Sequence, residues 1–91
     1  MDDPLVVARK RIDEIDGAII ALLNERARCA LRIGAIKRER GLSARDPERE
    51  ATVLARVERE AAGPLPGSSL RRIFVEIIAA CRSVQEQQSR R

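Results

Sequence analysis

The sequence contains no histidine, tryptophan or tyrosine, and it has a single phenylalanine in 91 residues. Without histidine the chain lacks the commonest metal ligand and the commonest general base in proteins. Any chemistry must therefore use arginine, lysine, carboxylate, amide or thiol groups. The scarcity of aromatic rings also removes the surfaces on which nucleic-acid bases stack. The net charge of +4 is therefore not enough to indicate a nucleic-acid binder.

Long apolar runs are missing as well, and the existing ones are too short to span a bilayer. Residues 1–11 carry acidic residues and a proline but no apolar segment typical of a signal peptide. Cys29 and Cys81 lie within helical apolar patterns, and their number does not suggest a disulfide framework. We expect two free, buried thiols in a cytoplasmic protein that does not bind membranes.

The patterns that are present are helical throughout, and no stretch alternates like a strand. They predict an all-α fold in a single domain over residues 1–91, with one very long helix and two shorter ones. The long helix is expected from about Pro4 to about Arg40. Asp46 should cap the second helix, which we expect to end near Ala62. Ser68 or Ser69 should cap the third, which we expect to reach about Gln88.

One seam of the long helix has apolar residues at alternating spacings of three and four, which is typical of packing against other helices. The seam consists of Leu5, Ala8, Ile12, Ile15, Ile19, Leu22, Arg26, Cys29, Ile33 and Ile36. A buried guanidinium at its seventh position is unfavourable by several kcal/mol unless an anion meets it. Arg26 must therefore pair with an acidic side chain of the protein or with a ligand.

The length of the first helix predicts a homodimer. About 37 residues give a helix of roughly 55 Å, and the two shorter helices cannot cover its seam from end to end. A second copy of the chain is the simplest partner for the uncovered part. We therefore expect a symmetric dimer built around paired long helices.

Two cations of the long helix share one face. Arg26 and Lys37 are eleven residues apart, which is close to three full turns and about 16 Å along the axis. Together they could hold a small dianion. Asp46, Arg49 and Glu50 follow shortly after Lys37 in the sequence, so we expect them to close one end of the same pocket.

The third helix and the start of the first supply the remaining candidates. Cys81 and Gln85 are four residues apart and lie on one helical face. Arg9 is about 25 Å from Arg26 along the helix and could reach the same pocket only from an antiparallel partner. Taken singly, each candidate has an ordinary structural role, such as an internal ion pair or a helix cap. Their joint spacing carries the hypothesis of a binding site.

At that spacing the chain resembles the all-helical (type II) chorismate mutase family over about residues 5 to 88. The matching elements are Arg9-Lys-Arg-Ile12-Asp-Glu-Ile15-Asp16, Leu22-Leu23-Asn-Glu25-Arg26, Ile33-Gly34-Ala-Ile-Lys37, Arg45-Asp46-Pro-Glu-Arg49-Glu50, and Ile77-Ile78 with Gln85. The resemblance implies an intertwined dimer of three-helix chains with two equivalent active sites. It also implies the Claisen rearrangement of chorismate to prephenate, on the route to phenylalanine and tyrosine, without metal or cofactor.

The resemblance implies a role for each candidate residue. Arg26 binds one carboxylate of the dianionic substrate, and Arg9 of the partner subunit binds the other. Lys37 and Gln85 donate hydrogen bonds to the ether oxygen of the breaking bond, where negative charge develops.

The remaining roles concern the ring of the substrate. By the family pattern Glu50 and the backbone of Asp46 hold the ring hydroxyl, and Arg49 organises the pocket. Cys81 stands where the family often has a serine. A thiol is a weaker donor than a hydroxyl, so Cys81 either contacts the substrate weakly or only lines the pocket.

Three alternatives remain open from the sequence. A family member acting on 4-amino-4-deoxychorismate would use the same cationic residues. An isochorismate pyruvate-lyase of the same fold is a weaker match, because an apolar residue tends to replace the acid at the position of Glu50. A non-catalytic helical interaction module, for example a basic nucleic-acid binder, explains the charge and the dimer but not Arg26, Lys37 and Gln85 together.

Overall fold

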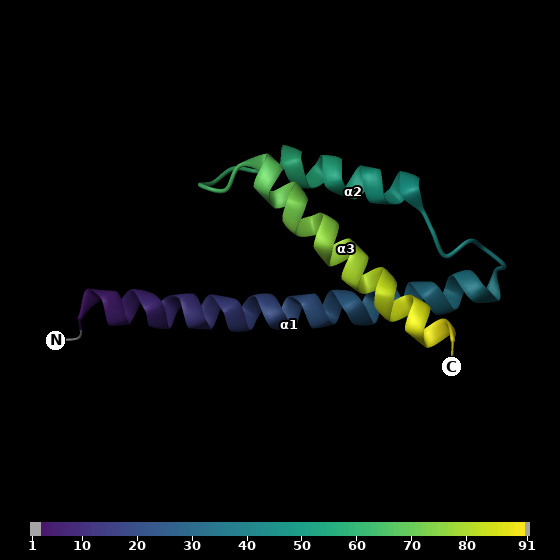
Figure 1. Ribbon diagram of the computed structural model, residues 1–91, viewed down its shortest axis with the longest axis horizontal. Coiled ribbons are helices and arrows are strands. Elements are labelled where there is room, and N and C mark those ends of the chain that lie inside the picture. The colour runs from purple at the N-terminus through teal and green to yellow at the C-terminus, as the bar shows by residue number, and fades with distance from the viewer. Residues whose placement is uncertain (1–2, 91) are drawn as a thin grey trace.

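The computed structural model describes residues 3–90, and these form three α-helices and no strand (Figure 1). Helix α1 spans Pro4–Glu39, α2 spans Pro47–Arg59 and α3 spans Gly67–Ser89. The all-α prediction with one very long helix is therefore confirmed. Met1, Asp2 and Arg91, at the ends of the predicted domain, lie outside the described residues. In the part of the chain described, no helix is long and apolar enough to cross a membrane.

Helix α1 begins and ends where its capping residues predict. The Asp3 carboxylate accepts a hydrogen bond from the Leu5 amide at 2.9 Å, and Pro4 occupies the first turn, where no amide donor is needed. At the other end Gly41 has a φ of +67°, and the Leu42 amide donates to the Lys37 carbonyl at 2.8 Å. This glycine-based ending turns the chain sharply toward α2.

The second and third helices differ from prediction at their junction. Helix α2 ends at Arg59, before the predicted Ala62, because its last turn tightens and the Gly63-Pro64 sequence that follows cannot continue a helix. The predicted serine cap of α3 is wrong. Pro66 is the N-cap residue, and its carbonyl accepts from the amides of Ser69 and Leu70.

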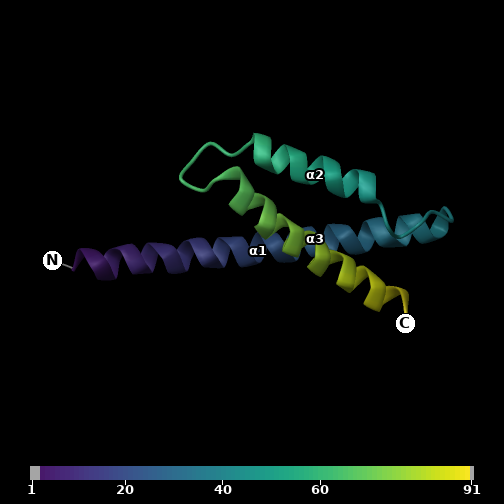
Figure 2. The same ribbon diagram turned by 45° about the horizontal axis from the view of Figure 1, so that its top comes forward.

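Helix α3 connects the other two, since it packs against α1 on one side and α2 on the other. Figures 1 and 2 show it crossing the C-terminal half of α1, while the N-terminal half of α1 projects beyond both shorter helices. The buried side chains within the chain are few and small: Ala30, Val53, Val57 and Cys81. Such a core provides little stability for a single chain.

The apolar seam of α1 is not the face that α3 covers. All nine apolar members of the seam are exposed within the chain, including Ile12 at 56% and Leu22 at 64%. Helix α3 instead covers the neighbouring face, on which Ala30 and Gly34 are buried. Arg26 lies at the border of the two faces and is half-buried.

Candidate active site

A cavity of about 290 Å³ lies between the C-terminal half of α1, the start of α2 with its preceding loop, and α3. Small-molecule sites in proteins typically have volumes of roughly 300–1,000 Å³, so this one suits a small ligand. Seven of the eight residues predicted from the sequence line it: Arg26, Lys37, Asp46, Arg49, Glu50, Cys81 and Gln85. The sequence spacing therefore identified one coherent pocket.

Small residues on α1 determine how closely α3 approaches. A Cβ atom added at Gly34 would lie 3.4 Å from Cγ of Gln85, so the space beneath α3 at this position is no larger than a methyl group needs. Ala30 precedes Gly34 by one turn and is also buried. Arg26 and Lys37 lie on the same face to either side of these two residues, and both reach the cavity.

The Arg26 guanidinium has a single side-chain partner among residues 3–90. Its Nη1 donates to Sγ of Cys81 at 3.1 Å, and no carboxylate in this part of the chain lies within ion-pair distance of it. Arg26 therefore forms no ion pair with an acidic side chain among residues 3–90. Of the two explanations for a charge in the seam, binding of an anionic ligand remains. A guanidinium carries five N–H donors, so most of its capacity can serve an anionic ligand.

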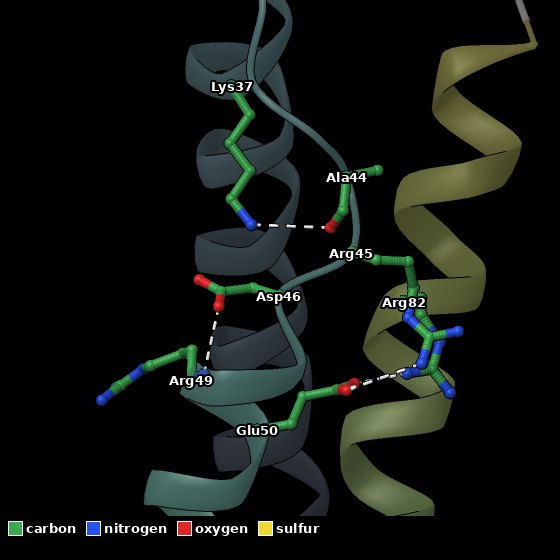
Figure 3. A network of polar contacts seen from close by, with 7 residues as sticks. All are labelled: Lys37, Ala44, Arg45, Asp46, Arg49, Glu50 and Arg82. Atoms are coloured by element: carbon green, nitrogen blue, oxygen red, sulfur yellow. Dashed lines mark hydrogen bonds and ion pairs between the residues drawn. The ribbon is translucent and has the colours of Figure 1, made fainter.

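Gln85 and Lys37 are held by backbone carbonyls at the cavity wall. Nε2 of Gln85 donates to the Ala30 carbonyl at 2.6 Å, which fixes the amide across the α1–α3 contact. Nζ of Lys37 donates to the Ala44 carbonyl in the following loop at 3.5 Å (Figure 3). An amide NH₂ has two donors and an ammonium three, so each group keeps at least one for a ligand.

The start of α2 brings two carboxylates to the cavity with different partners. Asp46 caps the helix, since its Oδ1 accepts from the Arg49 amide at 3.1 Å. The Glu50 carboxylate extends toward α3, where Oε1 pairs with Arg82 (Figure 3). Its Oε2 lies 3.9 Å from Nη2 of Arg45, a residue of the preceding loop. Glu50 is thus placed by charges on both sides, whereas Asp46 is placed by the backbone amide of Arg49.

The family model described as chorismate mutase type II matches residues 8–86. The chain belongs to this family. It is 36% identical to a solved chorismate mutase of Thermus thermophilus, with a TM-score of 0.91 over 94% of this chain and 98% of that one. A Helicobacter pylori chorismate mutase solved in complex with prephenate is 31% identical, with a TM-score of 0.85 over 94% of this chain and 93% of that one.

Relatives of the chorismate mutase family also include larger proteins. The chain is 41% identical over 85 residues to a bifunctional chorismate mutase/prephenate dehydratase of Neisseria gonorrhoeae. That match covers 93% of this chain but 23% of the relative. The chain therefore spans about a quarter of the length of the curated bifunctional relatives that it matches.

Arg9 is the one predicted site residue that does not line the cavity. It lies on the exposed N-terminal part of α1, far along the helix from Arg26. This agrees with the argument that Arg9 cannot reach the pocket of its own chain.

Two pocket residues, Arg45 and Arg82, were missed in the prediction of site residues. Arg45 belongs to one of the sequence elements shared with the family, but it lies in a loop, where helical periodicity cannot indicate the direction of a side chain. Arg82 follows Cys81 directly, and its pairing with Glu50 depends on where α3 crosses α2. The position of this crossing must be known before Arg82 can be recognised as the partner of Glu50, and the local spacing of residues does not give that position.

The two thiols differ from each other. Both are free, as predicted, and Cys81 is buried, but the expectation that Cys29 is buried was wrong for the single chain, where it is exposed. Cys29 belongs to the apolar seam and lines the open cavity, so no side chain of the same chain covers it fully.

The charges lining the cavity favour an anionic ligand. Five cationic side chains and two carboxylates face it, and one of the carboxylates caps a helix. The set can orient carboxylates and donate hydrogen bonds to oxygen atoms. It therefore suits chemistry in which the protein binds and polarises its substrate.

Proposed function

We propose that the chain catalyses the rearrangement of chorismate to prephenate in this cavity. The observation that carries the proposal is the convergence of Arg26, Lys37 and Gln85 on one pocket in a chain of the chorismate mutase type II family. Arg26 and Lys37 come from one helix face and Gln85 from another helix. A solvated surface or a nucleic-acid-binding face would not need such a convergence.

The reaction matches what the residues can do. It is a unimolecular rearrangement, so it needs no nucleophile, proton shuttle or metal. The enzyme must hold a flexible dianion in its compact reactive shape. It must also stabilise the negative charge that develops on the ether oxygen as the carbon–oxygen bond breaks.

Lys37 and Gln85 supply the stabilisation of the ether oxygen. The Gln85 amide is already fixed by its bond to the Ala30 carbonyl, so its second N–H is aimed without further loss of freedom. Lys37 adds a full positive charge from α1. Donors that are positioned before the reaction act in the transition state without reorganising.

Arg26 binds one substrate carboxylate, and Cys81 helps to position it. A planar guanidinium suits a carboxylate because it can donate two parallel hydrogen bonds. The Cys81 sulfur accepts one Arg26 N–H at 3.1 Å. We assign Cys81 the role of holding Arg26 in place. Arg49 adds positive potential beside the Asp46 backbone, which lies next to the ring of the substrate.

A second copy of the chain completes the site. The N-terminal half of α1 carries exposed large apolar side chains, among them Leu5, Ile12 and Ile19, which water does not favour. Pairing two α1 helices in antiparallel orientation buries these seams and carries Arg9 toward the pocket of the partner subunit. Arg9 then binds the second carboxylate of the substrate.

The direct test is to incubate the purified protein with chorismate and identify the product by chromatography. We expect prephenate, formed far faster than in buffer alone. A folded protein that leaves chorismate unchanged at the rate of the buffer control would contradict the proposal.

A further inference from the structure

Glu50 lies between two guanidinium groups in the cavity, and neither belongs to the set of residues predicted from the sequence. Arg82 reaches it from α3 and pairs with Oε1, while Arg45 approaches Oε2 from the loop before α2 (Figure 3). The side chains of Glu50 and Arg82 are only 24% and 29% exposed, whereas that of Arg45 is 59% exposed. Arg82 is therefore the less solvated and stronger partner of Glu50.

The chemistry of the proposed substrate indicates what Glu50 contacts. At neutral pH the two carboxylates and the ether oxygen of chorismate can only accept hydrogen bonds. The ring hydroxyl is its one donor, so its partner in the pocket must be an acceptor. The resemblance to the family gives this role to Glu50, whose carboxylate lines the cavity.

The two arginines decide which ring substituent Glu50 can accept. A hydroxyl is neutral and can donate to Glu50 while both guanidinium groups stay in place. A primary amine on a saturated ring carbon is protonated at neutral pH. An ammonium in the same position would face one carboxylate and two guanidinium groups, and like charges at close range are repulsive.

We infer that Arg82, acting through Glu50, makes this pocket select a substrate with a ring hydroxyl over one with a ring ammonium. Arg82 is thus a positioning and specificity-determining residue. The inference rests on the proposed function and narrows it: chorismate is the preferred substrate, and 4-amino-4-deoxychorismate is disfavoured by charge repulsion. Arg45 contributes in the same direction but less, because its side chain is more exposed.

The test compares kcat/KM for the two substrates in the wild type and in variants of Arg82. We expect the wild type to prefer chorismate by at least about tenfold. Arg82→Gln removes the charge and should shrink that preference by about tenfold, because it removes the repulsive element. Arg82→Lys keeps the charge and should retain most of the preference. A purely structural role for Arg82 would lower both values together.

A matched control comes from the same pair of helices. Arg71 of α3 pairs with Glu58 of α2 at 3.4 Å, and neither residue lines the cavity. Arg71→Gln therefore breaks a comparable ion pair outside the site and should leave the substrate ratio unchanged. If Arg82→Gln fails to fold by circular dichroism, Arg45→Gln in the exposed loop provides the measurement, with a smaller shift in the same direction.

The outcomes separate the two proposals. A wild type that converts neither substrate overturns the proposed function and this inference with it. A wild type that converts chorismate while Arg82→Gln and Arg45→Gln leave the ratio of kcat/KM unchanged overturns the inference alone. Equal use of both substrates by the wild type overturns it as well.

Discussion

The two halves of α1 have similar apolar periodicity but different surroundings. In the N-terminal half, residues 4–25 are all exposed, and the helix projects past α2 and α3 (Figure 1). In the C-terminal half, Ala30 and Gly34 are buried under α3, and Arg26 and Lys37 flank them at the cavity. One chain therefore provides a partner for only half of its longest helix.

The difference shows that one continuous helix can serve two separate purposes. The C-terminal half contributes Arg26 and Lys37 to the cavity, and its small residues Ala30 and Gly34 allow α3 to approach closely. The N-terminal half has a long exposed apolar surface and a distant arginine, and it projects past the other two helices of its chain. In the proposed dimer the apolar surface and the arginine of the N-terminal half find their binding partners only on the other subunit.

The two lysines of the chain give the largest expected contrast, since Lys10 lies in the N-terminal half and Lys37 in the C-terminal half. Lys37→Ala should lower the rate of prephenate formation by about 10³-fold, because it removes a charged donor to the developing ether oxyanion. Lys10→Ala should change the rate by less than about twofold, as expected for an exposed charge. A folded Lys37→Ala protein with near-normal activity would refute the assignment.

Placing a charge on the exposed seam should have the next largest effect. In Ile19→Glu a carboxylate would be buried without a partner in the proposed dimer, which is strongly unfavourable. We expect a monomer in sedimentation experiments, a loss of helical signal, and activity lowered by about 100-fold or more. Asp13→Lys, on the same half but outside the seam, is the control and should remain dimeric. A wild-type mass that stays monomeric at all concentrations would rule out the dimer.

Mixing two defective variants should show whether Arg9 acts across the subunits. Arg9→Ala and Lys37→Ala proteins should each be nearly inactive. When they are unfolded and refolded together, half of the dimers are mixed, and each mixed dimer has one intact site of two. We expect recovery to about a quarter of wild-type activity. If Arg9 served the pocket of its own chain, the mixture would recover nothing.

Alanine at two glycines of α1 should give the smallest contrast. A Cβ at Gly17 meets nothing within 4 Å in the chain, so Gly17→Ala should raise the free energy of unfolding by about 0.5–1 kcal/mol through helix propensity. Gly34→Ala would bring a methyl group to 3.4 Å from Cγ of Gln85, and we expect a smaller gain in stability and a several-fold fall in activity from a small shift of the Gln85 amide. Thermal unfolding and kcat measure the two effects. Equal stabilisation with unchanged kcat would show that Gly34 does not position Gln85.

Much of the fold could be predicted because its determinants are local. Asp3 and Asp46 cap helices through their own neighbours, and Gly41 ends α1 by adopting a left-handed backbone. The start of α3 was predicted incorrectly, because Gly67 packs against the last turn of α2. A Cβ there would lie 3.2 Å from the Glu58 carbonyl. That contact belongs to the tertiary structure, and the serine pattern does not contain it.

The candidate site also has a part that local sequence predicts and a part that depends on tertiary structure. Helical spacing was enough to bring Arg26 and Lys37 together, since both belong to one rigid helix. The pairing of Arg82 with Glu50 depends on the crossing of two helices and on a loop, so no periodicity in the sequence reveals it. The sequence shows even less of the partner of the exposed seam, because in the proposed dimer that partner lies on another molecule.

The charge around the cavity also affects how a ligand arrives. Five cations against two carboxylates leave a formal excess of three positive charges at the opening that the proposed dianionic substrate would approach. Such a field speeds up diffusional encounter and weakens as salt shortens the range of the attraction to about 10 Å at 0.1 M. The capture of substrate should therefore depend on ionic strength. The proposed rearrangement, among fixed groups inside the pocket, should hardly respond to salt.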